Sequence, residues 1–182
     1  LYQKAMEGDK DCGGMIACNY YSGEPVTGLE EGRPMFLRRP DSHLGLANFM
    51  RSHLYASLVT LKIGLDILLK EEDVKIDSIT GHGGLFKTKG VGQSILAAAM
   101  NAPISVMETA GEGGAWGMAL LAAYMLSKKD GQSLGDYLDS RVFAERKSET
   151  MEPDPADVAG FETYTKQYQA CLAAEKVAVQ AF

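Results

Sequence analysis

The chain has 182 residues, of which 46% are hydrophobic and 23% are charged, and this composition supplies enough apolar side chains for a globular core. Its formal net charge of −6 argues against a large nucleic-acid-binding face, and its three cysteines without a CxxC pair argue against a disulfide framework or a cysteine-rich zinc site. We find no signal peptide and no apolar run that approaches the roughly 18 residues of a membrane span, so we expect a soluble, cytoplasmic protein.

The first part of the chain predicts two short strands and a long helix. The opening residues, "LYQKAMEGDKDCGG", are typical of the end of a helix followed by a turn, and we expect the chain to begin inside a longer protein. Residues 15–21 ("MIACNYY") predict a strand closed by turn residues, and residues 34–40 ("PMFLRRP") predict a second strand between two prolines. From residue 40 to residue 73, apolar residues recur at spacings of three and four, which predicts one long helix with Ser42 at its N-cap.

The middle of the chain alternates strands, glycine-rich loops and helices. Residues 74–79 ("VKIDSI") alternate as a strand and lead into "TGHGGLFKTKG" at 80–90, which precedes a helix that ends near residue 100. Residues 104–109 ("ISVMET") predict the next strand, and "AGEGGAWG" at 110–117 begins another apolar helix. This alternation predicts an α/β fold in which these two strands are parallel neighbours. We expect all four strands to share one mixed sheet with helices on both faces.

Two further helices are predicted near the C-terminus. Residues 133–143 ("SLGDYLDSRVF") predict a short amphipathic helix. A terminal helix follows "MEPDP", with either Asp154 or Asp157 as its N-cap. Because we find neither an internal repeat nor a low-complexity linker, we expect residues 1–182 to form a single domain.

The two glycine-rich loops raise the question of ligand binding. Neither loop fits the G-x-x-x-x-G-K-[ST] or the G-x-G-x-x-G motif, and in the latter Phe86 and Trp116 stand where the third glycine would be. Both loops nevertheless lie between a strand and a helix N-terminus, where free amides favour anions, and loops after adjacent parallel strands open at the same edge of a sheet. Two interpretations stay open: tight turns, or bare backbone against a nucleotide with Lys87 and Lys89 near a phosphate.

The spacing of the other reactive side chains assembles no catalytic or metal-binding group. His82 lies in the first glycine-rich loop, whereas His43 and His53 lie on other elements, so we expect no metal site. Trp116 is expected to be a packing anchor rather than a ring stacked on a base. We find no Ser-His-Asp or Cys-His arrangement, and we assign no catalytic residue to this chain.

Two stretches together resemble the C-terminal domain of the FGGY family of carbohydrate kinases, and its ribulokinase- and xylulokinase-like members most of all. The first is a strand, the pair Gly83 and Gly84, the helix "QSILAAAMNAPISV", and then "ETAGEGGAWGMALLAAY". The second is the helix "ANFMRSHLYASLVT", which is similar to the family's second signature region. The polar, apolar and small positions of that region correspond to His53, Leu54 and Ser57. The resemblance covers nearly the whole chain and is strongest over residues 46–124.

The resemblance implies an actin-like, ribonuclease-H-like ATPase fold. A full-length enzyme would have two such domains, with ATP and the sugar in the cleft between them. The family's adenosine contacts are the second glycine of the pair and the residue four positions further on, which correspond to Gly84 and Thr88. Their neighbours Gly83 and Lys87 complete the candidate ATP site. The glycine pair follows His82 here, whereas the family usually has Asp or Gly at that place.

The resemblance also implies an activity and its requirements. The parent protein would be an ATP- and Mg²⁺-dependent kinase of a ketose, such as the pentuloses ribulose and xylulose, or of a polyol. The catalytic aspartate and the phosphate loop would come from an N-terminal domain outside these residues, so we expect the chain alone to be inactive. Its partners would be that domain, ATP and a small sugar, without nucleic acid or membrane, and a homodimer is compatible with it. The alternative is a non-catalytic nucleotide-binding or assembly module with the same fold.

Overall fold

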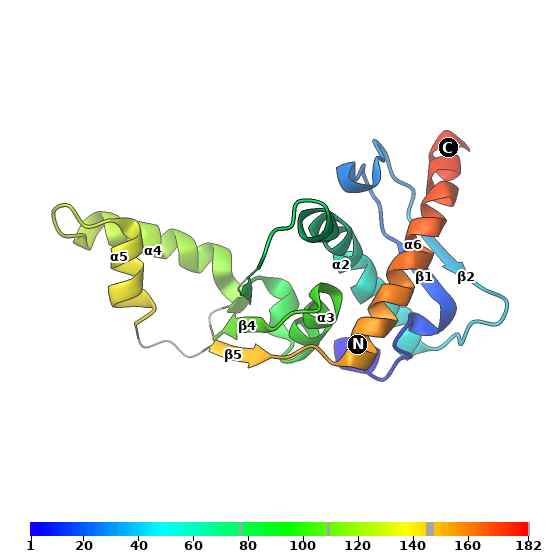
Figure 1. Cartoon of the computed structure of the whole chain (residues 1–182), viewed down its shortest axis with the longest axis horizontal. Coiled ribbons are helices and arrows are strands. Elements are labelled where there is room, and N and C mark those ends of the chain that lie inside the picture. The colour runs from blue at the N-terminus through cyan, green and yellow to red at the C-terminus, as the bar shows by residue number, and fades with distance from the viewer. Residues whose placement is uncertain (77, 109, 145–147, 182) are drawn as a thin grey trace.

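The chain forms a mixture of helices and short strands (Figure 1). The computed structural model describes residues 1–76, 78–108, 110–144 and 148–181. The helices are α1 (Tyr2–Ala5), α2 (Leu46–Lys70), α3 (Val91–Met100), α4 (Gly113–Ser127), α5 (Leu134–Tyr137) and α6 (Pro155–Ala181). The strands are β1 (Met15–Cys18), β2 (Met35–Arg38), β3 (Ile79–Gly81), β4 (Ile104–Met107) and β5 (Ser148–Met151). Figure 1 shows a body that contains both chain ends, and an arm of α4 and α5 that extends from it.

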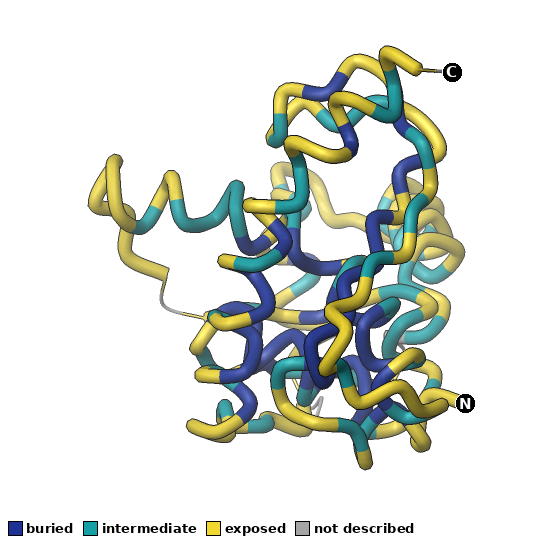
Figure 2. Tube along the Cα trace, turned by 90° about the vertical axis from the view of Figure 1, so that its right-hand side faces the viewer, coloured by how far each residue is buried: buried dark blue, intermediate teal, exposed yellow. Residues whose placement is uncertain are grey.

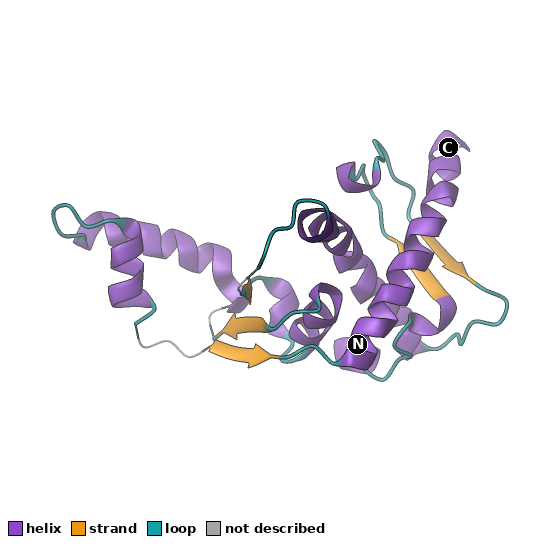
Figure 3. Cartoon of the chain, in the orientation of Figure 1, coloured by secondary structure: helices purple, strands orange, loops and turns teal. Residues whose placement is uncertain are grey.

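The strands form two separate sheets (Figure 3, orange). β1 pairs with β2 antiparallel, and the second sheet has the order β3-β4-β5, with β3 parallel to β4 and β5 antiparallel to β4. The parallel pair, with Ile79 opposite Ile104, confirms that these two strands are parallel neighbours. The predicted position of the first strand is wrong, because β3 spans residues 79–81 and residues 74–76 form no strand. The prediction of one four-stranded sheet is wrong, because among the described residues β1 and β2 pair only with each other. β5 is not predicted by the sequence, because "SETM" lacks the apolar alternation of a strand.

The core lies where α2, α3 and α6 pack together and where α2 and α6 pack against β1. All four residues of β1 are buried, and nine of the ten residues of α3 are buried. The alanines at positions 97–99 have small side chains, so α3 can lie close to α2 and α6. Figure 2 shows that buried positions gather in the middle of the molecule and that exposed positions cover its outside.

Helix α2 is the central helix of the body. By length and composition alone it could cross a membrane, contrary to the expectation that no described segment could. In the structure, however, it packs against α1, α3, α6 and β1, and it buries polar residues such as Asn48 and Arg51 that bond to neighbouring elements. These contacts are those of a core helix in a globular domain. Its N-cap is Gly45, so the prediction of Ser42 at this position is wrong.

A buried polar network joins the two ends of the chain to α2. The Arg51 side chain is fully buried, forms an ion pair with Asp157 of α6, and donates two hydrogen bonds to the Tyr55 hydroxyl at 3.2 and 3.0 Å. Lys10 Nζ lies 2.8 Å from the same carboxylate, and the Tyr55 hydroxyl donates to the Lys10 carbonyl at 3.0 Å. Arg51 also donates to the Ala5 carbonyl at the end of α1 at 3.3 Å. This network fixes α1, α2 and α6 relative to one another.

Two aspartates at the start of α6 have different roles. Asp154 Oδ1 accepts hydrogen bonds from the amides of Ala156 and Asp157 at 2.9 and 3.0 Å, and these bonds lower the pKa of the Asp154 carboxyl. Asp154 is therefore the N-cap, and of the two predicted candidates Asp157 is the wrong one. The Asp157 side chain is buried and serves the ion pair with Arg51 instead.

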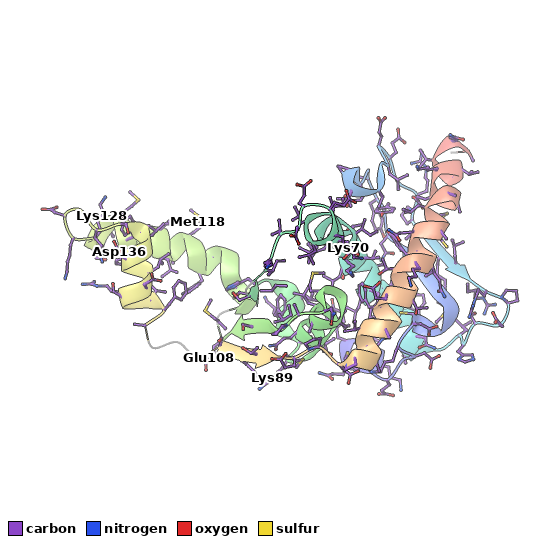
Figure 4. The ribbon with its side chains drawn as sticks, viewed as in Figure 1. Lys70, Lys89, Glu108, Met118, Lys128 and Asp136 are labelled. Atoms are coloured by element: carbon purple, nitrogen blue, oxygen red, sulfur yellow. The ribbon has the colours of Figure 1, made fainter. Side chains whose placement is uncertain are left out.

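The arm exposes an apolar helix. α4 has no charged residue, and none of its residues is buried. The side chains of Met118, Met125 and Leu126 are 68%, 76% and 90% exposed, and Figure 4 shows Met118 away from the body. α5 and the π-helical turn after it (Leu138–Val142) confirm the predicted short helix. They pack on α4 through two ring pairs. The pairs are Tyr124 with Tyr137 and Trp116 with Phe143, so Trp116 anchors packing as expected.

Candidate functional site

The two glycine-rich loops meet at one edge of the three-stranded sheet. The first loop leaves the carboxyl end of β3, and the second leaves the carboxyl end of β4, its parallel neighbour. Lys87 Nζ of the first loop lies 2.5 Å from Glu112 Oε1 of the second, and the His82 side chain lies against Gly113. The expectation that both loops open at the same edge is therefore confirmed, and this edge is the usual ligand side of α/β folds.

The backbone of the first loop explains two of its glycines. Gly83 has φ +111° and Gly90, the N-cap of α3, has φ +80°. Residues with a Cβ rarely adopt these conformations, so both positions favour glycine. They allow the chain to leave β3, form one 3₁₀ turn at Gly84–Lys87, and enter α3 within a few residues. At these positions the tight-turn interpretation is sufficient.

Close packing explains two more glycines. A Cβ on Gly81 would lie 2.3 Å from the ring of Phe86, and a Cβ on Gly92 would lie 2.5 Å from the carbonyl oxygen of Leu85. Neither distance is compatible with a side chain. Phe86 thus packs directly on Gly81 and Leu85 packs directly on Gly92, and these contacts require residues without a side chain at both glycine positions.

Gly84 is different from the other glycines of the loop. Its φ is not positive, it is exposed, and a Cβ built on it would meet no atom within 4 Å. Neither backbone conformation nor packing within the described part of the chain therefore requires glycine at this position. A ligand that lies against the backbone would explain the glycine, because a side chain at this position would occupy the space of that ligand.

A cavity of about 570 Å³ lies beside the turn. Thr88 and Lys89 line it from the end of the turn, Glu108 from the end of β4, and Glu149 from β5. Figure 4 shows Lys89 and Glu108 next to these strands. Lys89 Nζ lies 3.3 Å from Glu149 Oε2, and Gln93 of α3 donates to the Ile104 and Glu149 carbonyls at 2.7 and 2.8 Å. Charged side chains thus line the cavity, and the hydrogen bonds of Gln93 join α3 to β4 and β5.

The predicted site residues fall into distinct positions of one turn. Gly83 supplies the reversal, Gly84 is open to solvent, Lys87 pairs with Glu112, and Thr88 lines the cavity. Gly83, Gly84 and Lys87 are not among the residues that line this cavity. Within the described residues, no group of three His, Cys, Asp or Glu side chains could hold a metal ion.

The sequence interpretation missed the contribution of β5. Glu149 and Ser148 line the cavity from this strand, and Glu149 pairs with Lys89. Nothing in the short polar run "SETM" marks it as a strand, and its position beside β4 follows only from the backbone pairing. The spacing of residues in the sequence could not predict the pairing of Lys89 with Glu149, because the two residues are far apart along the chain.

Known solved structures share the fold. A ligand-bound xylulose kinase from Lactobacillus acidophilus matches with a TM-score of 0.70 at 20% identity, over 94% of this chain and 33% of that chain. Gluconate kinase from the same organism matches with a TM-score of 0.69 at 19% identity, over 94% and 33%. Glycerol kinase from Plasmodium falciparum, solved with ADP, matches with a TM-score of 0.61 at 17% identity, over 95% and 32%. The chain thus spans about a third of the length of these structures.

The fold of these kinases confirms the expected fold class. They have the actin-like, ribonuclease-H-like ATPase fold, and the chain shares it. A comparison with curated protein sequences gave no significant match. The sequence model of the C-terminal domain of the FGGY family of carbohydrate kinases, however, matches residues 2–126. The chain therefore belongs to the FGGY family of carbohydrate kinases, within its C-terminal domain.

Proposed function

We propose that this chain is the nucleotide-binding part of a cytoplasmic, ATP-dependent kinase that phosphorylates a hydroxyl group of a ketose, such as ribulose or xylulose, or of a polyol. The observation that carries this proposal is Gly84, an exposed residue of the first glycine-rich loop at which neither backbone conformation nor packing among the described residues requires glycine. Membership of the FGGY family supports ATP as the ligand that lies against the exposed backbone at Gly84.

The residues of the turn fit an adenosine moiety and its phosphates. The bare backbone at Gly83 and Gly84 lets the nucleotide approach, and the Thr88 hydroxyl, which has no hydrogen-bond partner among the described residues, is free to bond it. Lys87 and Glu112 are both exposed, so their ion pair is weak and the lysine can exchange partners at little cost. When bound, ATP supplies the phosphoryl group, and Mg²⁺ would accompany its phosphates.

The remaining groups must come from outside these residues. We assign no catalytic base to this chain, and we propose that an N-terminal domain supplies it together with the phosphate loop and most sugar contacts. The length of the related structures supports this division of roles, because the chain corresponds to only about a third of each. The chain's own task is to hold the nucleotide so that its terminal phosphate faces that domain.

The first test is the replacement of Gly84 with valine in the whole protein. The isopropyl group would occupy the space kept for the nucleotide, so we expect the KM for ATP to rise roughly tenfold or more while the KM for the sugar hardly changes. Steady-state kinetics with xylulose, ribulose, gluconate and glycerol as acceptors measures both constants and identifies the substrate.

Gly135→Val is a matched control for this variant. Gly135 is an exposed glycine of α5, and a Cβ on it meets only Ser133 Oγ at 3.8 Å. We expect its kinetics to equal those of the unchanged protein. An ATP KM that does not respond to Gly84→Val would leave that glycine without a ligand role. Tight ATP binding without transfer to any acceptor would support the non-catalytic alternative.

A second prediction concerns the Thr88 hydroxyl. Thr88→Ala removes one hydrogen bond to the nucleotide, so we expect ATP affinity to fall by about 1 kcal/mol, which is roughly fivefold in Kd. Isothermal titration calorimetry of the whole protein measures this change, and Thr88→Ser should retain most of the affinity. Equal losses in the alanine and serine variants would show that the hydroxyl makes no such bond.

A further inference from the structure

The cavity of about 570 Å³ between α3 and the three-stranded sheet contains a hydrogen-bond acceptor on a buried side chain. Gln93 lines this cavity and is only 6% exposed. Its Nε2 donates to the Ile104 and Glu149 carbonyls at 2.7 and 2.8 Å, and these two acceptors fix which end of the amide faces the strands. No described residue donates a hydrogen bond to the amide oxygen, Oε1. This oxygen is therefore the polar atom of Gln93 that is left for a molecule in the cavity.

The charged residues that line the cavity leave one carboxylate without a partner. Lys89 and Glu149 pair with each other, with 3.3 Å between Nζ and Oε2, so their charges offset. Glu108 lines the cavity from the end of β4 and is exposed (Figure 4). It forms no ion pair with any residue that the structure describes. The cavity therefore has one negative charge that a ligand can neutralise.

These two groups favour a positively charged ligand that carries N–H groups. Gln93 Oε1 and the Glu108 carboxylate only accept hydrogen bonds, so the ligand must supply the donors. A phosphate or carboxylate ligand would place a second negative charge beside Glu108, which is unfavourable. An ammonium group supplies both the donors and the opposite charge, and hydrogen bonds between ions are the stronger kind. Phe86, Val106 and Met107 form an apolar part of the lining, which suits the methylene groups of an alkyl chain.

We propose that this cavity binds a small organic cation, a primary amine with an aliphatic chain, whose ammonium group donates to Gln93 Oε1 and pairs with Glu108. The cavity volume is within the range of roughly 300–1,000 Å³ that is usual for small-ligand sites. The proposal does not depend on the nucleotide-binding function, because Gly84 is not among the residues that line this cavity. Residues 88–90 of the first glycine-rich loop do line it, so a bound amine would lie against the end of that loop.

The test is a titration of the whole protein with putrescine and with two analogues of the same chain length, followed by isothermal titration calorimetry without nucleotide. 1,4-Butanediol has no charge to pair with Glu108, so we expect it to bind at least tenfold more weakly than putrescine. Permethylated putrescine keeps both charges but has no N–H to donate to Gln93, so we expect it to bind about fivefold more weakly. Equal Kd values for the three compounds, or tighter binding of inorganic phosphate than of putrescine, would overturn the proposal.

A substitution locates the binding site. Glu108→Gln changes an exposed side chain, so the fold should be unaffected, and we expect the Kd for putrescine to rise about tenfold while that for 1,4-butanediol stays the same. Glu152→Gln is the matched control, because Glu152 is an exposed carboxylate outside the cavity. Gln93 is kept because its Nε2 joins α3 to two strands, and permethylated putrescine tests its oxygen instead.

The two glutamate variants decide the outcome. Equal putrescine Kd values for Glu108→Gln and Glu152→Gln would overturn the proposal. Since no nucleotide enters the titration, that result would leave the function proposed for Gly84 intact.

Discussion

Replacement of Arg51 with methionine is expected to lower the free energy of unfolding by about 3–5 kcal/mol, because it leaves the buried Asp157 carboxylate without its main partner. The Arg51 side chain is fully buried and the Asp157 side chain is 7% exposed, so water cannot replace the lost ion pair. The same change removes the hydrogen bonds to Tyr55 and to the Ala5 carbonyl. Urea-induced unfolding, followed by circular dichroism, measures the loss.

Two comparisons separate this effect from a general sensitivity to lost charge. Lys70→Met breaks the exposed ion pair with Asp66, where the lysine side chain is 64% exposed, and we expect a change of no more than about 1 kcal/mol. Figure 4 shows Lys70 on α2. The double variant Arg51→Met, Asp157→Leu removes both charges, so it should be more stable than Arg51→Met alone. A single variant as stable as the unchanged protein would show that the buried pair contributes nothing.

Replacement of Gly160 with alanine is expected to destabilise the fold by about 1–3 kcal/mol, because α6 lies directly on the backbone of Lys10. A Cβ on Gly160 would lie 2.1 Å from the Lys10 carbonyl oxygen and 2.4 Å from its carbonyl carbon. The helix must therefore move away from this segment, which also carries the Lys10 partner of Asp157 and accepts the bond from Tyr55. Thermal and urea unfolding both report the change.

Gly135→Ala is the control for this prediction. Both glycines are helical, but nothing lies within 3.4 Å of a Cβ at Gly135. Alanine there reduces the freedom of the unfolded chain without a clash, so the stability should stay the same or rise by up to about 1 kcal/mol. If both variants behave alike, the close approach of α6 to Lys10 does not limit the side chain at position 160.

The loss of Arg51 is expected to affect the candidate site through α1. Arg51 donates to the Ala5 carbonyl at the end of α1, and the Gln3 side chain of α1 donates to the Lys89 carbonyl of the glycine-rich loop at 3.3 Å. Loss of the network should therefore destabilise the glycine-rich loop as well as the fold.

Features that depend on neighbouring residues along the chain could be predicted from the amino-acid sequence. Apolar spacing predicted the long α2, because burial of one face imposes a period on a helix. The order of strands and helices predicted that β3 and β4 are parallel neighbours, although β3 lies at residues 79–81 and not at the alternating run 74–79. The glycine-rich loops and their position after adjacent parallel strands followed from the same reasoning. The resemblance to the FGGY family depended on such local stretches, and the match over residues 2–126 bears it out.

Contacts between residues that are far apart in the sequence became known from the three-dimensional packing. Arg51 and Asp157 are 106 residues apart in the sequence. The sequence offered both Asp154 and Asp157 as the N-cap of α6, and the packing of α6 against α2 shows that Asp154 caps the helix whereas Asp157 pairs with Arg51. The same holds for β5, whose polar residues form a strand because β4 offers them its free edge. It holds above all for the glycines of the loop, because composition cannot separate Gly81, which makes room for Phe86, from Gly84, which faces open space. That difference depends on what packs against each Cα, and long-range packing leaves no period in the sequence.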